Sequence, residues 1–600
     1  MSPPQTILDI FSESCDRFAG KTCFQYKKNG SWQSMSWEEA SRQVEAISLG
    51  LSQLGVRKGD TVALFSATRL EWTLCDLAIL SLGGVTVPIY QSNTAEQAQY
   101  IIEDAGAKVV FVEGEAQAKK IQSVQSSLPQ LQKLILMEGA SEFLPLITTL
   151  EALCQSGAKE AQEKGSVWEK AKKAIEPRDM ATIVYTSGTT GNPKGAILTH
   201  GNIVGEVEAC MKIISLSPDQ VGLCFLPLAH IVARAIQFFQ LKAGFVNAYA
   251  ESIDKLIDNL AEVRPHFIVS VPRIFEKVYE RVQSQVQAGS PIKKGIFAWA
   301  LQVGRQVSQK LQRREGVPLS LKVQYSLARR LVFGKILQKL GGRLEFSISG
   351  GAPLSREIAE FFHAMGLLIL EGYGLTETTA AINCNSPNDY RFGTVGRPAL
   401  GVEEKIAPDG EILVRGPMVF KGYYRKPEAT REAVDGEGWF RTGDIGLMDA
   451  EGYLTITDRK KDIIVTAAGK NIAPQNLENL IKMDPYISQV MIHGDKRKYL
   501  SALVTLNQAE VQKFASERGI AFHHFGDLVR HPQIYNLIKQ SIEEKNQKLP
   551  SYETIKKFAI LENDFTQEAG ELTPTLKVKR RFVSEKYREV LDKLYQDGEH

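Results

Sequence analysis

The sequence has few of the features that mark a secreted, zinc-binding or membrane-spanning protein. Its seven cysteines are scattered and form no C-x-x-C pair, which argues against a disulfide framework or zinc site and favours a reducing compartment. No run of about 18 apolar residues occurs, and the first residues lack a basic segment followed by an apolar one. The net charge of +3 gives no reason to expect a nucleic-acid partner. We therefore predict a cytoplasmic protein that does not span a membrane.

The chain is instead composed like an ordinary globular protein of more than one domain. At 600 residues it is too long for one hydrophobic core, and it is 43% hydrophobic and 24% charged. Short apolar runs such as 61–65, 108–112 and 267–271 alternate with segments of helical periodicity, which predicts an α/β fold with parallel or mixed sheets. Glycine-rich turns and short strands follow residue 395. The charged cluster 458–462 then precedes a final α+β stretch, and we place a domain boundary there.

The string YTSGTTGNPKGAILTH, residues 185–200, combines small hydroxylated residues and glycines with one lysine. Glycines allow successive backbone N–H groups to face one point, and the hydroxyls and Lys194 add donors and charge that suit a polyphosphate. The spacing differs from G-x-x-x-x-G-K-[ST], which excludes the usual P-loop ATPase. A flexible hairpin between strands at 183–185 and 196–198 is the alternative interpretation.

Three further strings have the composition of a nucleotide site. SGGAP, 349–353, follows a strand-like run at 344–348 and is predicted to open a helix, where small residues let a flat base approach the backbone. EGYGLTETT, 371–379, supplies an aromatic ring, a hydroxyl and the carboxylate of Glu377, which could hold Mg²⁺. In GWFRTGDIG, 438–446, Asp444 could accept hydrogen bonds from ribose hydroxyls or simply fix a tight turn.

A basic block covers residues 277–343. It contains fourteen Lys and Arg residues against only Glu280 and Glu315, and its apolar residues recur at helical spacing. The block is consistent with solvated helix faces packed on the main domain, with peripheral contact to anionic lipid headgroups, or with a field that attracts an anionic substrate.

Taken in order, the strings YTSGTTGNPKG, GGAP, GYGLTE, TGD, DRKKD and LTPTLKVKR resemble the AMP-forming adenylating superfamily of acyl-CoA synthetases, nonribosomal adenylation domains and beetle luciferases. Residues 458–478, the C-terminal LTPTLKVKR and LPLAHIVAR at 226–234 are most similar to long-chain fatty acid–CoA ligases. Val232 and Ala233 depart from the bulkier or acidic residues common there. The resemblance implies a large multi-sheet N-terminal domain, 1–457, a hinge, 458–463, and a small mobile α+β C-terminal domain, 464–600, carrying the catalytic lysine.

The resemblance also implies a role for each site residue. Catalytic roles fall to Lys577, Glu377 and Thr186, of which Thr186 and Glu377 would ligate Mg²⁺. The phosphates of ATP would contact Thr186, Ser187, Gly188, Thr189, Thr190, Gly191 and Lys194. Adenine and ribose would contact Gly351, Ala352, Pro353, Tyr373, Thr376, Asp444 and Arg459. Lys461 would be the hinge, Gly469 would face coenzyme A, and His230 would lie at the acyl pocket.

The implied activity is the ATP-dependent conversion of a fatty acid to acyl-AMP, followed by transfer to coenzyme A. The implied substrates and cofactors are therefore a long-chain fatty acid, ATP, Mg²⁺ and coenzyme A. A fatty acyl-AMP ligase that loads a carrier protein, an aryl or medium-chain acyl-CoA ligase, and a catalytically silent nucleotide-binding scaffold remain alternatives. A homodimer and association with the inner face of the membrane through 277–343 are left open.

Overall fold

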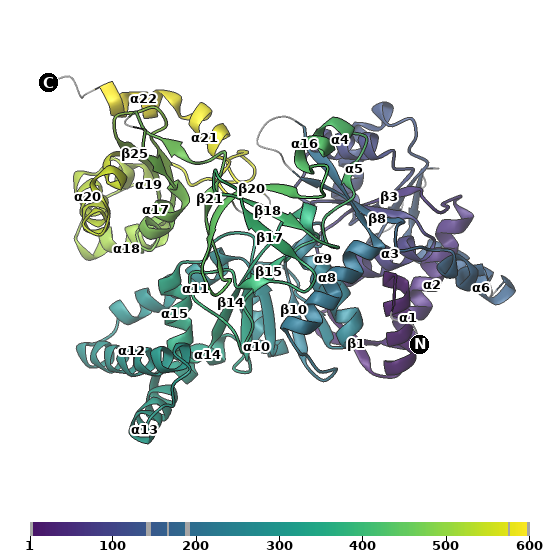
Figure 1. Cartoon of the computed structure of the whole chain (residues 1–600), viewed down its shortest axis with the longest axis horizontal. Helices are drawn as coiled ribbons and strands as arrows, with labels where there is room; N and C mark the ends of the chain where they lie inside the picture. Colours follow the sequence, from purple (N-terminus) through teal and green to yellow (C-terminus); the bar gives the residue numbers. More distant parts are fainter. Residues whose placement is uncertain are drawn as a thin grey trace.

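The computed structural model describes residues 4–139, 146–164, 167–186, 192–467, 469–573 and 577–596. Figure 1 shows a large body that contains the N-terminal and central elements, and a smaller C-terminal part, coloured yellow and light green, on one side of it. This α/β architecture, with one large and one small part, confirms the predicted fold class.

A nine-stranded sheet forms one half of the large body, in the order β16-β15-β14-β13-β12-β10-β11-β1-β2. Its strands from β14 to β1 are parallel, while β2, β15 and β16 run antiparallel to their neighbours. The bounds are β1 Thr22–Lys28, β2 Ser31–Ser36, β10 Val221–Cys224, β11 Val246–Tyr249, β12 Phe267–Ser270, β13 Phe346–Ser349, β14 Leu368–Tyr373, β15 Asn383–Cys384 and β16 Arg397–Pro398.

An eight-stranded sheet forms the other half, in the order β19-β9-β8-β4-β3-β5-β6-β7. Strands β8 and β9 form the antiparallel hairpin predicted for 183–185 and 196–198, and residues 187–191 between them lie outside the described residues. The bounds are β3 Thr61–Phe65, β4 Val85–Ile89, β5 Val109–Val112, β6 Lys133–Leu136, β7 Ile147–Thr149, β8 Met180–Thr186, β9 Lys194–Thr199 and β19 Gly422–Tyr423. Strands β3 and β4 are buried throughout, as expected for parallel strands covered on both faces.

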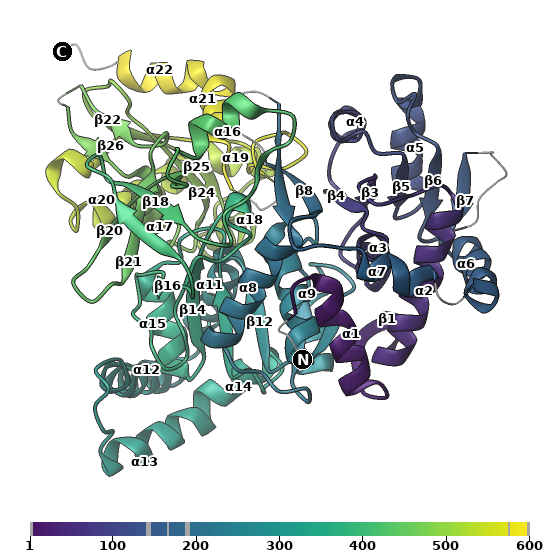
Figure 2. The same ribbon diagram turned by 45° about the vertical axis from the view of Figure 1, so that its right-hand side comes forward.

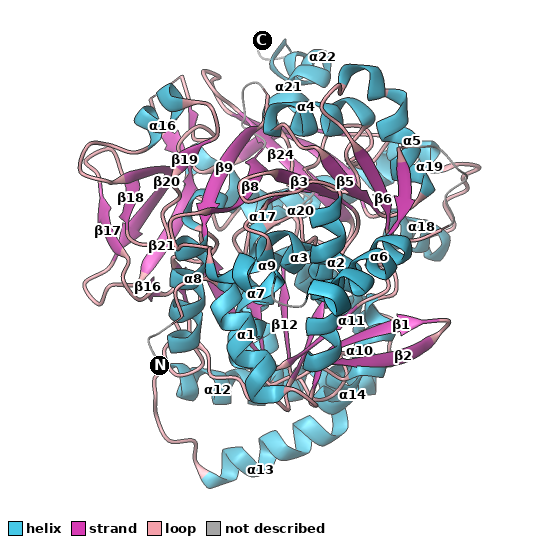
Figure 3. Cartoon of the chain, turned by 90° about the vertical axis from the view of Figure 1, so that its right-hand side faces the viewer, coloured by secondary structure: helices cyan, strands magenta, loops and turns pink. Residues whose placement is uncertain are grey.

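The main hydrophobic core lies between the two sheets. It joins side chains of β1 and β3 to helices that include α1, α2, α3 and α9 (Figure 3). Helices α4 and α5 cover the far face of the eight-stranded sheet. The bounds of these and neighbouring elements are α1 Ile7–Phe18, α2 Trp37–Gln53, α3 Leu70–Ser81, α4 Ala95–Ala105, α5 Glu115–Ser123, η1 Gln125–Ser127, α6 Leu150–Lys164, α7 Val167–Lys173, α8 His200–Ile213 and α9 Ile231–Ala243.

The far face of the nine-stranded sheet is covered by the helices of the basic block and their neighbours. Their bounds are α10 Leu256–Val263, α11 Pro272–Gln287, α12 Pro291–Gln312, α13 Leu319–Ala328, the π-helix η2 Arg329–Phe333, α14 Gly334–Lys339 and α15 Arg356–Met365. The helical spacing predicted from Val303 to Leu340 is therefore correct. Leu311, Leu327 and Leu331 are nevertheless exposed, so this spacing did not identify buried positions.

An antiparallel sheet, β17-β18-β20-β21, connects the large body to the smaller part. Its last strand ends at Arg459, the residue after which the chain enters the smaller part. The bounds here are η3 Thr376–Thr378, β17 Glu403–Ile406, β18 Glu411–Arg415, α16 Pro427–Ala433, β20 Phe440–Met448 and β21 Leu454–Arg459.

The smaller part has its own core around β24-β25-β26 (Figure 2). It contacts α11 of the large body, where Arg273 Nη2 donates to Ser488 Oγ at 3.3 Å and Ser284 Oγ donates to Glu510 Oε1 at 2.6 Å. The bounds are β22 Ile464–Val465, β23 Asn471–Ile472, α17 Pro474–Ile481, β24 Ile487–His493, β25 Leu500–Leu506, α18 Gln508–Glu517, α19 Phe525–Val529, α20 Pro532–Asn546, η4 Ser551–Glu553, β26 Ile555–Ile560, α21 Arg580–Lys586 and α22 Arg588–Gln596.

Two structural absences apply to the described residues. None of their helices is long and apolar enough to cross a membrane. Within the same residues, no cysteine is joined to another in a disulfide.

Candidate active site

Three predicted nucleotide-binding residues meet at the boundary between the large body and the smaller part. Arg459 Nε lies 3.1 Å from Asp444 Oδ1, and the Tyr373 hydroxyl donates to Asp444 Oδ2 at 2.8 Å. Asp444 and Arg459 are paired across β20 and β21, while Tyr373 ends β14. Because Asp444 lies inside a strand, the alternative that it fixes a tight turn is wrong.

Electrostatics tie these three side chains to one another. Burial raises the pKa of Asp444, and the neighbouring Arg459 guanidinium opposes that rise. Asp444 in turn raises the pKa of Arg459. The carboxylate can still accept hydrogen bonds from a ligand, because an ionised carboxylate has about four lone-pair sites and only two contacts are used here.

The glycine-rich segments lie at the carboxyl ends of β13 and β14. Gly351 has φ of +79°, which glycine adopts without steric cost. A Cβ atom on Gly374 would lie 1.4 Å from the Ala380 carbonyl oxygen, so this turn requires glycine. Ala352 and Pro353 follow Gly351 and are half-buried. The segment SGGAP connects β13 to α15, which begins at Arg356, so the predicted order of strand, small residues and helix is present.

Thr376 begins η3, a short turn that holds the next residue, Glu377, in a buried position. Burial raises the pKa of Glu377, while a hydrogen bond from Tyr423 opposes the rise. The Tyr423 hydroxyl donates to Glu377 Oε1 at 2.9 Å, and the Lys194 ammonium lies 5.1 Å from the centroid of the Tyr423 ring. One tyrosine therefore links the predicted metal ligand to the predicted phosphate-binding lysine.

The sequence interpretation did not select Tyr423. It lies in KGYYRKPEAT on β19, which pairs with β9 beside Lys194. The signal that could have found it is a tyrosine in a short strand-like segment, which is a weak signal without knowledge of the strand pairing.

The two ends of the predicted phosphate loop are described, although its middle is not. Thr186 ends β8 directly opposite Lys194 on β9, and the Thr186 hydroxyl donates to the Lys194 carbonyl at 3.4 Å. Ser187, Gly188, Thr189, Thr190 and Gly191 lie outside the described residues. Among the described residues, no group of three or more His, Cys, Asp or Glu side chains is arranged to hold a metal ion.

Lys577 reaches this site from the smaller part. Burial lowers its pKa to about 8, with the charge of Arg459 acting in the same direction and that of Asp444 opposing it. His230 is affected in turn: burial lowers its pKa to about 4, and the charge of Lys577 lowers it further. Residues from the large body and the smaller part therefore share one electrostatic environment.

His230 also has a structural role. It is the N-cap of α9, and its Nδ1 accepts a hydrogen bond from the Val232 N–H at 3.3 Å. Arg234, in the same string, is fully buried and binds Asp76 at 2.6 Å and the Thr182 hydroxyl at 2.6 Å. The ion pair joins α9 to Asp76 on α3, and the hydrogen bond to Thr182 joins the start of α9 to β8, the strand that leads into the predicted phosphate loop.

A small apolar cavity lies beside α9, at the nine-stranded sheet. Its volume is only about 20 Å³, and its lining includes Ala233, Ile236, Phe267 and Val269. It lies next to the helix that His230 caps, but it is too small to hold an acyl chain.

The predicted hinge residue and the predicted coenzyme A residue are both exposed. Lys461 is exposed, whereas Lys460 binds Asp409 at 2.7 Å and Glu411 at 2.9 Å. Gly469 has φ of +73° in an exposed turn, and a Cβ atom there would meet no other atom within 4 Å.

Comparison with known proteins agrees with this geometry. Residues 11–424 match the AMP-binding enzyme family and residues 461–599 match the AMP-binding enzyme C-terminal domain, so the chain belongs to this family. It is 40% identical to the long-chain-fatty-acid–CoA ligase FadD15 of Mycobacterium bovis, over 95% of this chain and 94% of that protein. It is 33% identical to the peroxisomal long chain acyl-CoA synthetase 7 of Arabidopsis thaliana, over 95% and 82% of the two chains.

The fold is also found in solved structures. The adenylation domain of a carboxylate reductase from Mycobacterium chelonae superposes with a TM-score of 0.77 at 23% identity, covering 99% of this chain and 92% of that one. This likeness extends through both the large body and the smaller part. It confirms the acyl-CoA synthetase-like fold that the ordered strings predicted.

Proposed function

We propose that the chain is a long-chain fatty acid–CoA ligase that forms an acyl-AMP intermediate. The observation that carries the proposal is the convergence of Asp444, Arg459 and Lys577 on one site, from the large body and the smaller part. The names of its relatives support the same activity and the same class of substrate.

In the first half-reaction, a carboxylate oxygen of the fatty acid attacks the α-phosphorus of ATP, and the bond to the departing pyrophosphate breaks. Asp444 and Arg459 would hold the ribose, and Thr186 and Lys194 would hold the phosphates. Lys577, as a cation, would contact the attacking carboxylate and the α-phosphate oxygens, where negative charge accumulates in the transition state. In the second half-reaction, the sulfur of coenzyme A attacks the acyl carbonyl and AMP leaves.

The donor set also suits Mg²⁺. The Glu377 carboxylate and the Thr186 hydroxyl are hard oxygen donors, and Mg²⁺ commonly combines one or two protein oxygens with phosphate oxygens and water. Among the described residues, Tyr423 is the side chain that donates to this carboxylate, and it binds Oε1, which leaves Oε2 without a side-chain donor. When bound, Mg²⁺ would neutralise charge on the phosphates.

We further propose that residues 1–457 and 464–600 are domains that rotate about 458–463. Lys577 must contact the carboxylate in the first half-reaction, whereas coenzyme A must reach the same carbon in the second. A rotation about Lys461 would withdraw Lys577 and bring the Gly469 turn toward coenzyme A. The exposure of Lys461, next to the anchored Lys460, supports a change of φ and ψ at this point.

Lys461→Pro tests the hinge, because proline fixes φ near −65° and removes an N–H. We expect pyrophosphate–ATP exchange to survive while acyl-CoA formation falls severely. Lys461→Ala is the control, and it should preserve both half-reactions. A proline at Lys496 would not be a suitable control, because φ at that residue is +56°. Equal loss of both half-reactions in Lys461→Pro would indicate a folding defect, and normal acyl-CoA formation would place the hinge elsewhere.

One assay separates the proposed activity from its alternatives. A long-chain CoA ligase releases pyrophosphate with palmitate and releases AMP only when coenzyme A is added. A carrier-loading acyl-AMP ligase would not respond to coenzyme A, an aryl or medium-chain ligase would prefer other acids, and a silent scaffold would release neither product. A chain-length series of kcat/KM would then define the acyl specificity.

Peripheral contact with an anionic membrane through 277–343, on the cytoplasmic side, is also part of the proposal. The excess of basic residues in this segment supports it.

A further inference from the structure

The helix α13 leaves a row of apolar side chains uncovered. Leu319, Val323, Leu327 and Leu331 are 78%, 64%, 48% and 45% exposed. They are spaced four residues apart, so they lie along one side of the helix. Residues four apart on an α-helix are slightly offset around its axis, so a row at this spacing gradually turns around the helix. The π-helix η2 has a wider turn than an α-helix, and this offsets part of that turning. The row therefore continues from α13 into η2.

The opposite side of the same helix is packed. Leu321 is 9% exposed, and Ala328 and Phe333 are fully buried among α12 and the helices around it. Helix α13 is thus ordered by its inner face. Its apolar outer row is not needed to hold it in place.

Basic side chains surround the exposed row without acidic partners. Residues 316–343 contain six Lys and Arg residues and no Asp or Glu. Over the part of the chain that the structure describes, Lys322, Arg329, Arg330 and Lys335 take part in no ion pair. The polar hollow between α12 and α13, about 360 Å³, is lined in part by Arg313 and by Lys310, of which Lys310 pairs with Glu315 at 2.6 Å. Apolar residues bordered by unpaired cations have the composition of a helix that lies in the interface of an anionic bilayer.

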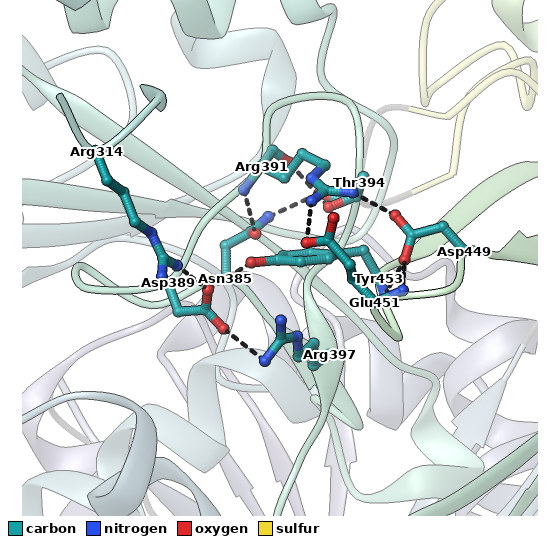
Figure 4. Close-up of polar contacts among 9 residues, drawn as sticks. All are labelled: Arg314, Asn385, Asp389, Arg391, Thr394, Arg397, Asp449, Glu451 and Tyr453. Carbon is teal, nitrogen blue, oxygen red and sulfur yellow. Dashed lines mark hydrogen bonds and ion pairs between the residues drawn. The ribbon is translucent and has the colours of Figure 1, made fainter. Parts of the chain in front are cut away.

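The position of α13 permits such contact. The helix lies at the outer end of the large body, beyond α12, in the views of Figures 1 and 3. The turn between the two helices is anchored by Arg314, whose guanidinium binds Asp389 at 2.6 Å. Figure 4 shows Asp389 joined in turn to Arg397 and Tyr453, and thereby to the β20–β21 turn. The helix therefore extends outward from a fixed base.

We propose that α13 is an interfacial anchor that inserts Leu319, Val323, Leu327 and Leu331 into an anionic lipid leaflet while Arg329 and Arg330 contact its headgroups. This inference rests on the membrane contact proposed above and identifies the surface that makes it. A second copy of the chain fits this surface less well, because a symmetric contact would bring six basic residues of each copy together without acidic partners.

Flotation of the full chain with lipid vesicles tests the anchor. Vesicles of phosphatidylcholine mixed with phosphatidylglycerol should bind the protein, and vesicles of phosphatidylcholine alone should bind it weakly. The triple variant Leu319→Gln, Val323→Gln, Leu327→Gln should lower the partition coefficient by at least about tenfold, because less apolar surface is buried. Charge reversal of Arg329 and Arg330 should lower it by about tenfold or more at low salt.

A matched control replaces three equally exposed apolar residues elsewhere, Ile253→Gln, Leu400→Gln and Leu447→Gln, and should bind vesicles normally. Replacing Leu319, Val323 and Leu327 by methionine should also preserve binding, since it keeps the apolar row. Thermal melts establish that each variant is folded. Activity with a short, water-soluble fatty acid reports the ligase reaction separately from membrane binding.

Each result has a defined meaning. If the α13 glutamine variant binds anionic vesicles normally, the proposal that α13 is an anchor is wrong. This holds even if the basic block binds membranes by charge alone. If the intact chain binds no vesicles, both the anchor and the membrane contact are wrong, whatever its ligase activity. If the apolar row instead supports a dimer that the glutamine variant abolishes without any vesicle binding, the occupant is a second copy and the anchor is overturned.

Discussion

The proposed ribose side of the site, Asp444 with Arg459 and Tyr373, and its proposed phosphate side, Lys194 and Lys577, differ in how fully their side chains are paired. On the ribose side, Asp444 contacts both Arg459 and Tyr373. On the phosphate side, neither the Lys194 nor the Lys577 ammonium has a hydrogen bond or ion pair to a side chain among the described residues. Lys194 lies over an aromatic ring, and burial lowers the pKa of Lys577, with the charge of Arg459 acting in the same direction.

This difference agrees with the charges of the two groups that we propose bind there. A ribose is neutral, so the residues that bind it can neutralise each other before it arrives. A triphosphate is strongly anionic, and cations that already had carboxylate partners would have to lose them on binding. The cations on the phosphate side are therefore prepared for a ligand that brings the compensating charge.

Among the variants that test this comparison, Lys577→Ala should have the largest effect on the rate. Removal of the cation should slow acyl-AMP formation by about 10²-fold or more, as loss of a preorganised charge at a transition state does. Palmitate-dependent pyrophosphate release measures it, and thiolysis of supplied acyl-AMP should stay largely intact. Lys579→Ala removes a nearby lysine as control. Near-normal pyrophosphate release by Lys577→Ala would remove Lys577 from the mechanism.

On the proposed ribose side, Asp444→Asn removes a charge that pairs with Arg459 and that we propose also binds the sugar. A hydrogen bond to a charged group contributes about 1.5–3 kcal/mol, so KM for ATP should rise roughly tenfold to a hundredfold. Steady-state kinetics at saturating palmitate measure this rise. Asp409→Asn, which removes a carboxylate bound to Lys460 at the surface, is the matched control. An unchanged KM for ATP would show that Asp444 is structural only.

A smaller effect is expected from Tyr423→Phe, which keeps the ring near Lys194 and deletes the hydroxyl that binds Glu377. We expect kcat/KM for ATP to fall roughly fivefold to tenfold, since one hydrogen bond to a carboxylate is lost. Titration with Mg²⁺ should show a higher requirement. Tyr424→Phe is the control, and identical Mg²⁺ curves for Tyr423→Phe and the unmodified chain would contradict the link.

The smallest predicted effect is a dependence on pH. The pKa of Lys577 is lowered to about 8, so the ammonium that adenylation requires is present below that pH and is lost as the pH rises through it. The value of kcat/KM for pyrophosphate release should therefore fall above pH 8, well before an ordinary lysine titrates at about 10.4. Lys577→Arg should abolish this alkaline decline even if its rate is lower. A flat profile of the unmodified chain to about pH 10 would mean that the pKa is not lowered.

Sequence reasoning was most successful where chemistry follows from residue type and order. Asp444, Arg459 and Tyr373 were selected from short strings, and the structure brings both Arg459 and Tyr373 within hydrogen-bond distance of Asp444. It failed for Tyr423, because nothing in KGYYRKPEAT shows which of the two tyrosines faces Glu377. That choice depends on the pairing of β19 with β9, which is a long-range contact.

The basic block shows the same limit. Helical spacing correctly predicted the helices of 277–343, but it did not show which apolar residues are buried. Leu327 and Ala328 are neighbours in the chain, yet the first is 48% exposed and the second is fully buried. Only the packing of α13 against α12 separates them.

The sequence by itself determined the family, the fold class and the chemical groups of the site, because ordered motifs and local periodicity are encoded by neighbouring residues. The ordered motifs implied one site for Lys577, Arg459 and His230, but only the tertiary structure shows how burial and charge act on Lys577, more than a hundred residues beyond Arg459, and on His230. It also decided that one side of α13 stays uncovered. Both depend on which distant surfaces pack together, since burial and Coulomb interactions act through space and not along the chain.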